Sequence, residues 1–124
     1  MNTSVRKIYL SLENNLPTAN NHYSVYVVEL SKDVLKEHKF MIKNPDYITG
    51  KPCLYIGMTG LKVEDRLSKH MNGIKHNVYV LKYGLHLVPE LYEKYNPMSF
   101  EQALEMEFYL GNKLRELGCA CWFA

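Results

Sequence analysis

Apolar runs separated by polar stretches with proline or glycine divide this chain into short strands and helices. Residues 23–30 (YSVYVVEL) and 53–57 (CLYIG) are rich in Val, Ile, Leu and Tyr, which predicts buried strands. Residues 78–83 (VYVLKY) and 119–123 (CACWF) have a similar composition, which predicts a third strand and a terminal strand. The pattern therefore predicts several short strands rather than a purely helical fold.

Helical spacing marks two longer segments. In residues 63–74, apolar side chains recur every three or four positions, at Val63, Leu67, Met71 and Ile74, which is typical of an amphipathic helix. Residues 100–117 have the clearest limits, because Ser99 and Gln102 form a capping-box pattern and Gly118 is a typical C′ residue. Two shorter helices are predicted, over residues 31–38 after Ser31 as N-cap and over residues 89–95.

The chain length of 124 residues predicts one folded domain, over residues 23–124. Residues 14–21 (NNLPTANN) are polar and predict a loop, so residues 1–22 are interpreted as an N-terminal arm or loop. No apolar run approaches the roughly 20 residues of a membrane span, and residues 1–12 have no secretory pattern. The three cysteines form no CxxC pair, which favours a reducing, cytoplasmic location over a disulfide framework or a zinc site.

Net charge is only +2, so binding to a polyanion would need a local basic patch. Lysines on or near the helix at 63–74 and the expected strand at 78–83 form the candidate patch; they are Lys62, Lys69, Lys75 and Lys82. The competing interpretation is that these lysines belong to an ordinary solvated surface. Ten tyrosines supply side chains that suit both cores and nucleic-acid surfaces. If the lysines grip phosphates, affinity should fall steeply with salt.

Chemistry is suggested by the segment that follows the second expected strand. Tyr55 lies in that strand, and Arg66 and His70 lie four residues apart on one face of the next helix, at the edge of its apolar stripe. A guanidinium suits a phosphate oxygen, and an imidazole accepts or relays a proton near neutral pH. The competing interpretation is a solvated pair on an amphipathic helix, with the strand tyrosine in the core.

Glu107 lies on the predicted apolar stripe of the last helix, which is expected to face the core and consists of Phe100, Ala103, Leu104, Phe108, Gly111 and Leu114. An unpaired carboxylate on a buried face is costly unless a cation meets it. Two interpretations remain: a helix-edge glutamate that reaches water or an arginine, or a ligand for a hard divalent cation such as Mg²⁺.

These residues together resemble the GIY-YIG nuclease superfamily, in particular its small stand-alone bacterial members. The resemblance is carried by Ser24-Val25-Tyr26, Tyr55-Ile56-Gly57 with Thr59, Arg66, His70 and Ala103-x-x-x-Glu107. It implies an α+β fold, an α/β/α-like sandwich in which helices flank a small central antiparallel sheet of three or more strands. It implies a metal-dependent endonuclease that cleaves nucleic acid, with DNA as the expected substrate, and leaves a 5′-phosphate.

The resemblance also implies roles for five side chains. Tyr26 and Tyr55 would be active-site phenols, Arg66 the phosphate clamp and His70 a proton-transfer partner. Glu107 would bind one Mg²⁺ or Mn²⁺ ion. The alternative is a nucleic-acid-binding or protein-interaction module that keeps the fold without cutting, and a partner protein could supply specificity in either case.

The chain departs from the family pattern in three places. Ser24 stands where the first motif has glycine, and Cys119 stands where many members have an asparagine. The segment between the two motif tyrosines is longer than usual, because residues 31–52 form an insertion. That insertion carries five lysines against three acidic residues, so it is either a grip for nucleic acid or a plain structural addition.

Overall fold

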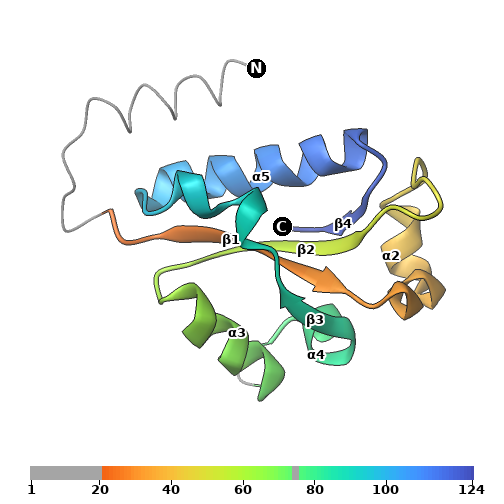
Figure 1. Ribbon diagram of the computed structural model, residues 1–124, viewed down its shortest axis with the longest axis horizontal. Helices are drawn as coiled ribbons and strands as arrows, with labels where there is room; N and C mark the ends of the chain where they lie inside the picture. Colours follow the sequence, from red (N-terminus) through yellow and green to blue (C-terminus); the bar gives the residue numbers. More distant parts are fainter. Residues whose placement is uncertain (1–20, 74–75) are drawn as a thin grey trace.

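The computed structural model describes residues 21–73 and 76–124, and four strands within them form one sheet (Figure 1). In the order β3-β1-β2-β4, β1 runs antiparallel to both β3 and β2, whereas β4 runs parallel to β2. The strands are β1 Ser24–Leu30, β2 Cys53–Thr59, β3 Gly84–Leu87 and β4 Ala120–Trp122. The predicted α+β class and antiparallel centre are confirmed, and the parallel edge strand makes the sheet mixed. Nearly all of the predicted arm over 1–22 lies outside the described residues.

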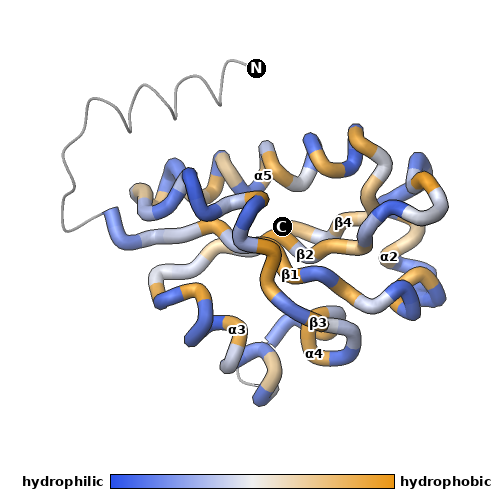
Figure 2. Tube along the Cα trace, viewed as in Figure 1, coloured by the Kyte–Doolittle hydropathy of each residue, from blue (hydrophilic) through white to orange (hydrophobic). Residues whose placement is uncertain are grey.

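Helices lie on both sides of this sheet. α5 (Phe100–Glu116) packs on one side, and α3 (Val63–Met71) and α4 (Val78–Tyr83) lie on the other (Figure 1). The apolar residues of β1 and β2 run through the middle of the molecule (Figure 2), and Val25, Val27 and Ile56 have no exposed surface. Hydrophobic burial on both faces therefore holds the strands that carry the two motif tyrosines. Among the described residues, no helix has the length and apolar character that crossing a membrane requires.

The prediction of a strand over residues 78–83 is wrong, because these residues form α4. The side-chain oxygen of Asn77 accepts hydrogen bonds from the backbone N–H groups of Tyr79 and Val80, at 2.9 and 3.3 Å, and so caps the helix. Tyr79 and Val80 are buried, whereas Val78 and Leu81 are exposed, which is a helical and not an alternating pattern. The Asn77 cap outweighs the strand propensity of residues 78–83, and β3 begins only after α4.

The shorter predicted helices differ from the observed elements in length and type. Ser31 caps a 3₁₀ turn over Lys32–Lys36, and a separate helix, α2 (His38–Ile42), follows it. The segment predicted as a helix over 89–95 contains two 3₁₀ turns, Pro89–Leu91 and Glu93–Tyr95. Short 3₁₀ turns form where a segment has too few residues to offset the unfavourable free energy of nucleating an α-helix.

The limits of α5 agree with the sequence. The Ser99 side chain accepts from the Gln102 backbone N–H at 3.2 Å, and the Gln102 side chain accepts from the Ser99 backbone N–H at 2.9 Å. Gly118 follows the helix with φ +97°, a conformation that favours glycine. Both predicted signals are confirmed, so the position of Glu107 within the helix is fixed from both ends.

We expect Ser99→Ala to lower the free energy of unfolding by about 1 kcal/mol, because it removes the side-chain acceptor for one helix N–H. Urea denaturation should show a lower midpoint with an unchanged slope. Ser68→Ala, at an exposed position within α3, is the matched control and should not lower the midpoint, because alanine favours a helix interior more than serine does. A midpoint for Ser99→Ala equal to that of the wild type would show that the cap contributes nothing.

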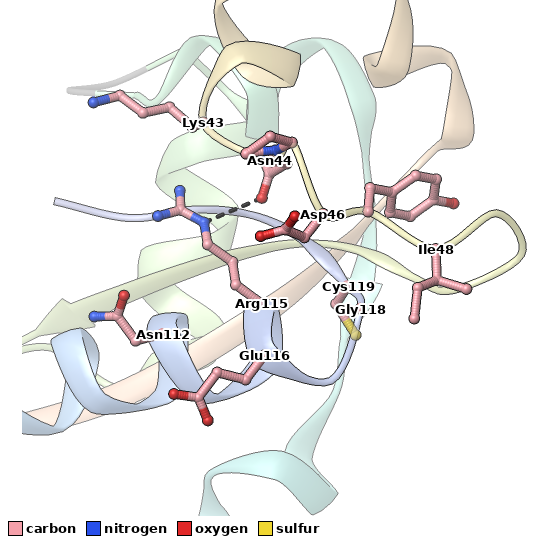
Figure 3. Close-up of a pocket in the computed structure, with 11 residues that line it drawn as sticks. Lys43, Asn44, Asp46, Ile48, Asn112, Arg115, Glu116, Gly118 and Cys119 are labelled. Carbon is pink, nitrogen blue, oxygen red and sulfur yellow. Dashed lines mark hydrogen bonds between the residues drawn. The ribbon is translucent and has the colours of Figure 1, made fainter.

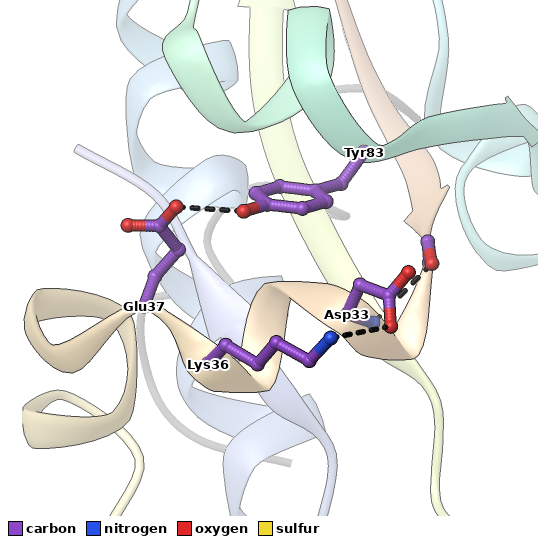
Figure 4. Close-up of polar contacts among 5 residues, drawn as sticks. Asp33, Lys36, Glu37 and Tyr83 are labelled. Atoms are coloured by element: carbon purple, nitrogen blue, oxygen red, sulfur yellow. Dashed lines mark hydrogen bonds and ion pairs between the residues drawn. The ribbon is translucent and has the colours of Figure 1, made fainter.

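The insertion at 31–52 is bound to the rest of the fold by buried and half-buried polar contacts. The Asn44 side chain donates to the carbonyl of Cys121 at 3.1 Å and accepts from the Cys121 backbone N–H at 2.7 Å. Near the start of the insertion, the Tyr83 hydroxyl donates to Glu37 at 2.6 Å, beside the Asp33–Lys36 ion pair (Figure 4). These contacts support the interpretation of the insertion as a structural addition.

Candidate functional site

The register between β1 and β2 brings the two motif tyrosines together. Tyr26 lies opposite Gly57, and Val28 lies opposite Tyr55, so Tyr26 and Tyr55 are diagonal neighbours on one face of the sheet. Their ring centroids are 6.1 Å apart. The centroid of the His70 ring lies 6.1 Å from that of Tyr26 and 5.7 Å from that of Tyr55. The two strands and α3 therefore place two phenols and one imidazole in a single cluster.

Gly57 makes room for this cluster. A Cβ atom at position 57 would lie 2.6 Å from both Cζ and Oη of Tyr26 and 2.9 Å from Cε1 of Tyr55. Contacts this short require the rings to move, so only a hydrogen at this position allows both phenols to stay in place. The motif glycine is thus explained by the side chains that it admits.

We expect Gly57→Ala to displace both phenols and to destabilise the fold by about 1–3 kcal/mol, as overpacking in a core does. If the phenols act in catalysis, any activity of the protein should fall further than the loss of folded protein accounts for. Activity per folded molecule, with the folded fraction taken from urea denaturation, is the measurement.

The control for this substitution is Gly50→Ala. A Cβ at position 50 would meet no atom within 4 Å, although its φ of +96° makes any side chain strained. Gly50→Ala should therefore lower stability by about 1 kcal/mol and leave activity per folded molecule unchanged. Equal activity losses in the two variants would show that the space beside the phenols has no special role.

His70 is buried, with only 1% of its surface exposed, whereas the sequence pattern placed it at the edge of the apolar stripe of its helix. Its Nε2 lies 2.8 Å from the Tyr26 hydroxyl, and its Nδ1 accepts the backbone N–H of Asn77 at 3.0 Å. Burial, with smaller contributions from the positive charges of Arg66 and His76, lowers the pKa of His70 to about 4. The imidazole is therefore neutral at pH 7.

Arg66 lies one helical turn before His70 and is half-buried. Its positive charge favours the ionised forms of Tyr26 and Tyr55 and disfavours the protonated form of His70, so it acts on all three rings. Burial nevertheless dominates and raises the pKa of both phenols. Arg66 thus supplies a positive charge to the cluster predicted from sequence.

Glu107 comes from α5, which packs on the other side of the sheet from α3 and α4. Burial is the main cause of the raised pKa of Tyr26 and Tyr55, and the negative charge of Glu107 raises both further. The residue is 6% exposed, and burial raises the pKa of its carboxyl to about 7. Of the two interpretations of Glu107, a helix-edge side chain reaching freely into water does not fit this burial.

The buried face of α5 differs from the predicted stripe. Phe100, Leu104 and Phe108 were predicted to face the core, but they are 45%, 45% and 64% exposed. The side chains that face the core are Ala103, Met106, Glu107, Leu110 and Leu114. The many apolar residues of this helix concealed its orientation, although Glu107 lies on the buried face either way.

The donor set around Glu107 is small. Among residues 21–73 and 76–124, no three His, Cys, Asp or Glu side chains come together as a metal-binding group. Mg²⁺, however, keeps several waters and is commonly held by one or two carboxylates together with substrate phosphate oxygens. A buried carboxylate whose ionised form is disfavoured by burial alone fits a site of that kind, because a cation would stabilise the charged form.

The lysines predicted to bind nucleic acid differ in their position and in their ion pairing. Lys62 and Lys69 are exposed, at the start and near the end of α3. Lys82 lies on α4 and not on a strand, and its ammonium forms an ion pair with Glu37 at 3.6 Å. Lys75 lies outside the described residues. Lys62 and Lys69 are thus the remaining candidates among the described lysines of that set.

Asn77 is a site residue that the sequence interpretation missed. It contacts His70 through its backbone, so no side-chain motif marks it, and its role as N-cap of α4 was hidden by the strand-like composition of residues 78–83. The available signal was an N-cap residue followed by apolar positions with helical spacing at Tyr79, Val80 and Tyr83.

A pocket of about 580 Å³ lies apart from the aromatic cluster, between the insertion and the end of α5 (Figure 3). Arg115 lines it and donates from Nε to Asn44 at 3.1 Å and from Nη2 to the Cys121 carbonyl at 2.8 Å. Cys119 also lines this pocket. None of the five candidate catalytic residues does, so the pocket is separate from the proposed chemistry.

No protein-family model, curated protein or solved structure matches this chain. The function must therefore be argued from the site itself.

Proposed function

We propose that this protein is a metal-dependent endonuclease that hydrolyses phosphodiester bonds in nucleic acid, with DNA as the expected substrate. The supporting observation is the cluster of Tyr26, Tyr55 and His70, on whose phenols the charges of Arg66 and Glu107 act. Perturbed pKa values that share one location are typical of functional sites. The three free thiols fit a reducing compartment, and we include the cytoplasm in the proposal.

Phosphodiester hydrolysis needs neutralisation of the charge that develops on the non-bridging oxygens. In the proposed mechanism, the planar guanidinium of Arg66 binds these oxygens, because it offers parallel donors and a permanent charge. The guanidinium already acts electrostatically on both phenols, so a phosphate held by Arg66 would lie beside them. Preorganised charge of this kind is usually a large part of catalysis.

The phenols would position the attacking water or the phosphate. Burial raises the pKa of both Tyr26 and Tyr55, so both hydroxyls are neutral at pH 7 and donate and accept hydrogen bonds. Glu107 would hold the single Mg²⁺ or Mn²⁺ ion, which supplies Lewis-acid polarisation of the phosphoryl group when bound. The low pKa of His70 makes a role as proton acceptor at neutral pH unfavourable.

The direct test is a cleavage assay on supercoiled plasmid and on single-stranded DNA with Mg²⁺, with Mn²⁺ and with EDTA. The proposal expects nicking or strand cleavage with either metal, none with EDTA, and products that carry a 5′-phosphate. If the protein binds DNA but cleaves it neither with Mg²⁺ nor with Mn²⁺, the result favours the non-catalytic module and rejects the enzyme.

Salt dependence tests the proposed contacts with the phosphate backbone. We expect the logarithm of the DNA dissociation constant to change with the logarithm of salt concentration by roughly 0.7–0.9 per phosphate contact. Fluorescence anisotropy in EDTA would measure this slope without cleavage. Lys62→Ala and Lys69→Ala should each reduce the slope by about one contact, whereas Lys36→Ala, in the ion pair with Asp33, should not. A slope unchanged in all three variants would reject Lys62 and Lys69 as backbone contacts.

A further inference from the structure

We propose that Asn77 is a positioning residue of this site. Its backbone N–H fixes His70 in the tautomer with the proton on Nε2, so that the imidazole donates to Tyr26 and does not accept a proton from water. The consequence for catalysis rests on the proposed function, whereas the tautomer itself does not.

The tautomer follows from the partner of Nδ1. A backbone N–H can only donate, and the Asn77 N–H lies 3.0 Å from Nδ1, so Nδ1 must offer its lone pair. A neutral imidazole carries one ring proton, which must then be on Nε2. The imidazolium would bring a second proton onto Nδ1 and face the Asn77 N–H donor to donor, which agrees with the lowered pKa of His70.

The direction of the next hydrogen bond is then set. Nε2–H donates to the Tyr26 hydroxyl oxygen across 2.8 Å, so the hydroxyl proton of Tyr26 points away from His70. The Tyr55 ring lies 6.1 Å from the Tyr26 ring, centroid to centroid, so Tyr55 is the other polar neighbour of Tyr26 in the cluster. The Tyr26 hydroxyl proton is thus available to an acceptor other than His70.

The donors therefore run from the Asn77 backbone through His70 to the Tyr26 hydroxyl. Tyr26 is 1% exposed, whereas Tyr55 is only half-buried, so Tyr55 is the phenol nearer to solvent. In the proposed nuclease, the Tyr55 hydroxyl donates a hydrogen bond to a phosphate oxygen, together with the guanidinium of Arg66. His70 orients Tyr26 and receives no proton.

The Asn77 side chain holds the backbone that does this. Its Oδ1 accepts from the N–H groups of Tyr79 and Val80, and Asn77 itself is extended, with φ −87° and ψ 134°. The residue thus links the start of α4 to the imidazole of α3. Two substitutions separate its two contacts: Asn77→Ala removes the cap and keeps the N–H, whereas Asn77→Pro removes both.

Nuclear magnetic resonance tests the tautomer directly. In ¹⁵N-labelled protein, long-range correlations between ring protons and nitrogens distinguish protonated from bare nitrogens, and His70→Gln assigns the His70 signals. At pH 7 we expect a protonated Nε2 and a bare Nδ1. A proton on Nδ1, or an imidazolium, would overturn the proposal. The measurement needs no activity, so a correct tautomer in a protein that never cleaves DNA would reject the nuclease alone.

The paired variants test the role of the backbone N–H. Asn77→Ala should keep the Nε2–H tautomer. Asn77→Pro should produce a mixture of tautomers and lower kcat about 10- to 100-fold beyond Asn77→Ala, as the loss of an orienting partner does. Asn72→Ala, at an exposed position after α3, is the control and should retain wild-type kcat. A pure Nε2–H tautomer in Asn77→Pro would overturn the proposal, and the wild-type spectrum decides the tautomer if that variant does not fold.

Discussion

Glu107→Gln is expected to abolish cleavage and to make the protein more stable. The wild-type carboxyl is buried, and its pKa of about 7 shows that the folded state disfavours the ionised form that a metal ion requires. An amide of the same shape carries no charge and removes that penalty. Above pH 7 and without metal, we expect a gain of about 1–2 kcal/mol, discounted because the carboxyl retains some contact with water.

The sign of the pH dependence follows from the two protonation states. The folded pKa of about 7 lies above the ordinary value of 4.5, so the folded state retains a proton that the unfolded state has lost. The contribution of Glu107 to stability is therefore fully present below about pH 4.5 and is lost as the pH rises through 7. In EDTA, the stability difference between Glu107→Gln and wild type should be small at pH 4.5 and largest at pH 8.

Thermal or urea unfolding at these two pH values is the measurement, with Glu105→Gln as the control at an exposed position of the same helix. Mg²⁺ should raise the melting temperature of the wild type and of Glu105→Gln, but not that of Glu107→Gln, because a ligand stabilises only the state that binds it. A Glu107→Gln variant less stable than wild type at pH 8 without metal would contradict the account of this carboxyl.

Arg66→Ala is expected to lower the rate of the cleavage step by about 10²- to 10³-fold. The reason is that Arg66 supplies the positive charge next to both phenols, where charge would develop on the phosphate. Arg66→Lys should recover only part of this loss, because an ammonium lacks the planar pair of donors.

Single-turnover kinetics at saturating protein would measure this loss separately from DNA binding. Ser68→Ala, at an exposed position of the same helix, should cleave at the wild-type rate. Cleavage by Arg66→Ala within threefold of wild type would remove Arg66 from the catalytic site.

The sequence predicted the parts of the fold that depend on strong local signals. The capping box at Ser99 and the glycine at Gly118 marked α5, and the apolar composition of β1 and β2 marked the two central strands. The α4 segment was mispredicted because β-branched and aromatic residues favour a strand, and a single cap at Asn77 decided otherwise.

The composition of the cluster was predictable, but its geometry was not. Spacing along α3 put Arg66 and His70 on one side, yet it could not tell that His70 is buried against Tyr26, because that depends on how the helix packs on the sheet. The contact between the Asn77 backbone and His70 joins two helices and leaves no side-chain pattern. Contacts of this kind are visible only in three dimensions.

The most direct test of the central claim is the single-turnover rate of DNA cleavage with Mn²⁺, measured side by side for wild type, Glu107→Gln and Glu105→Gln. We predict equal rates for wild type and Glu105→Gln, and a rate at least 100-fold lower for Glu107→Gln. Cleavage by Glu107→Gln at the wild-type rate would contradict the claim that the side chains gathered around Tyr26 and Tyr55 form a metal-dependent site for phosphodiester hydrolysis.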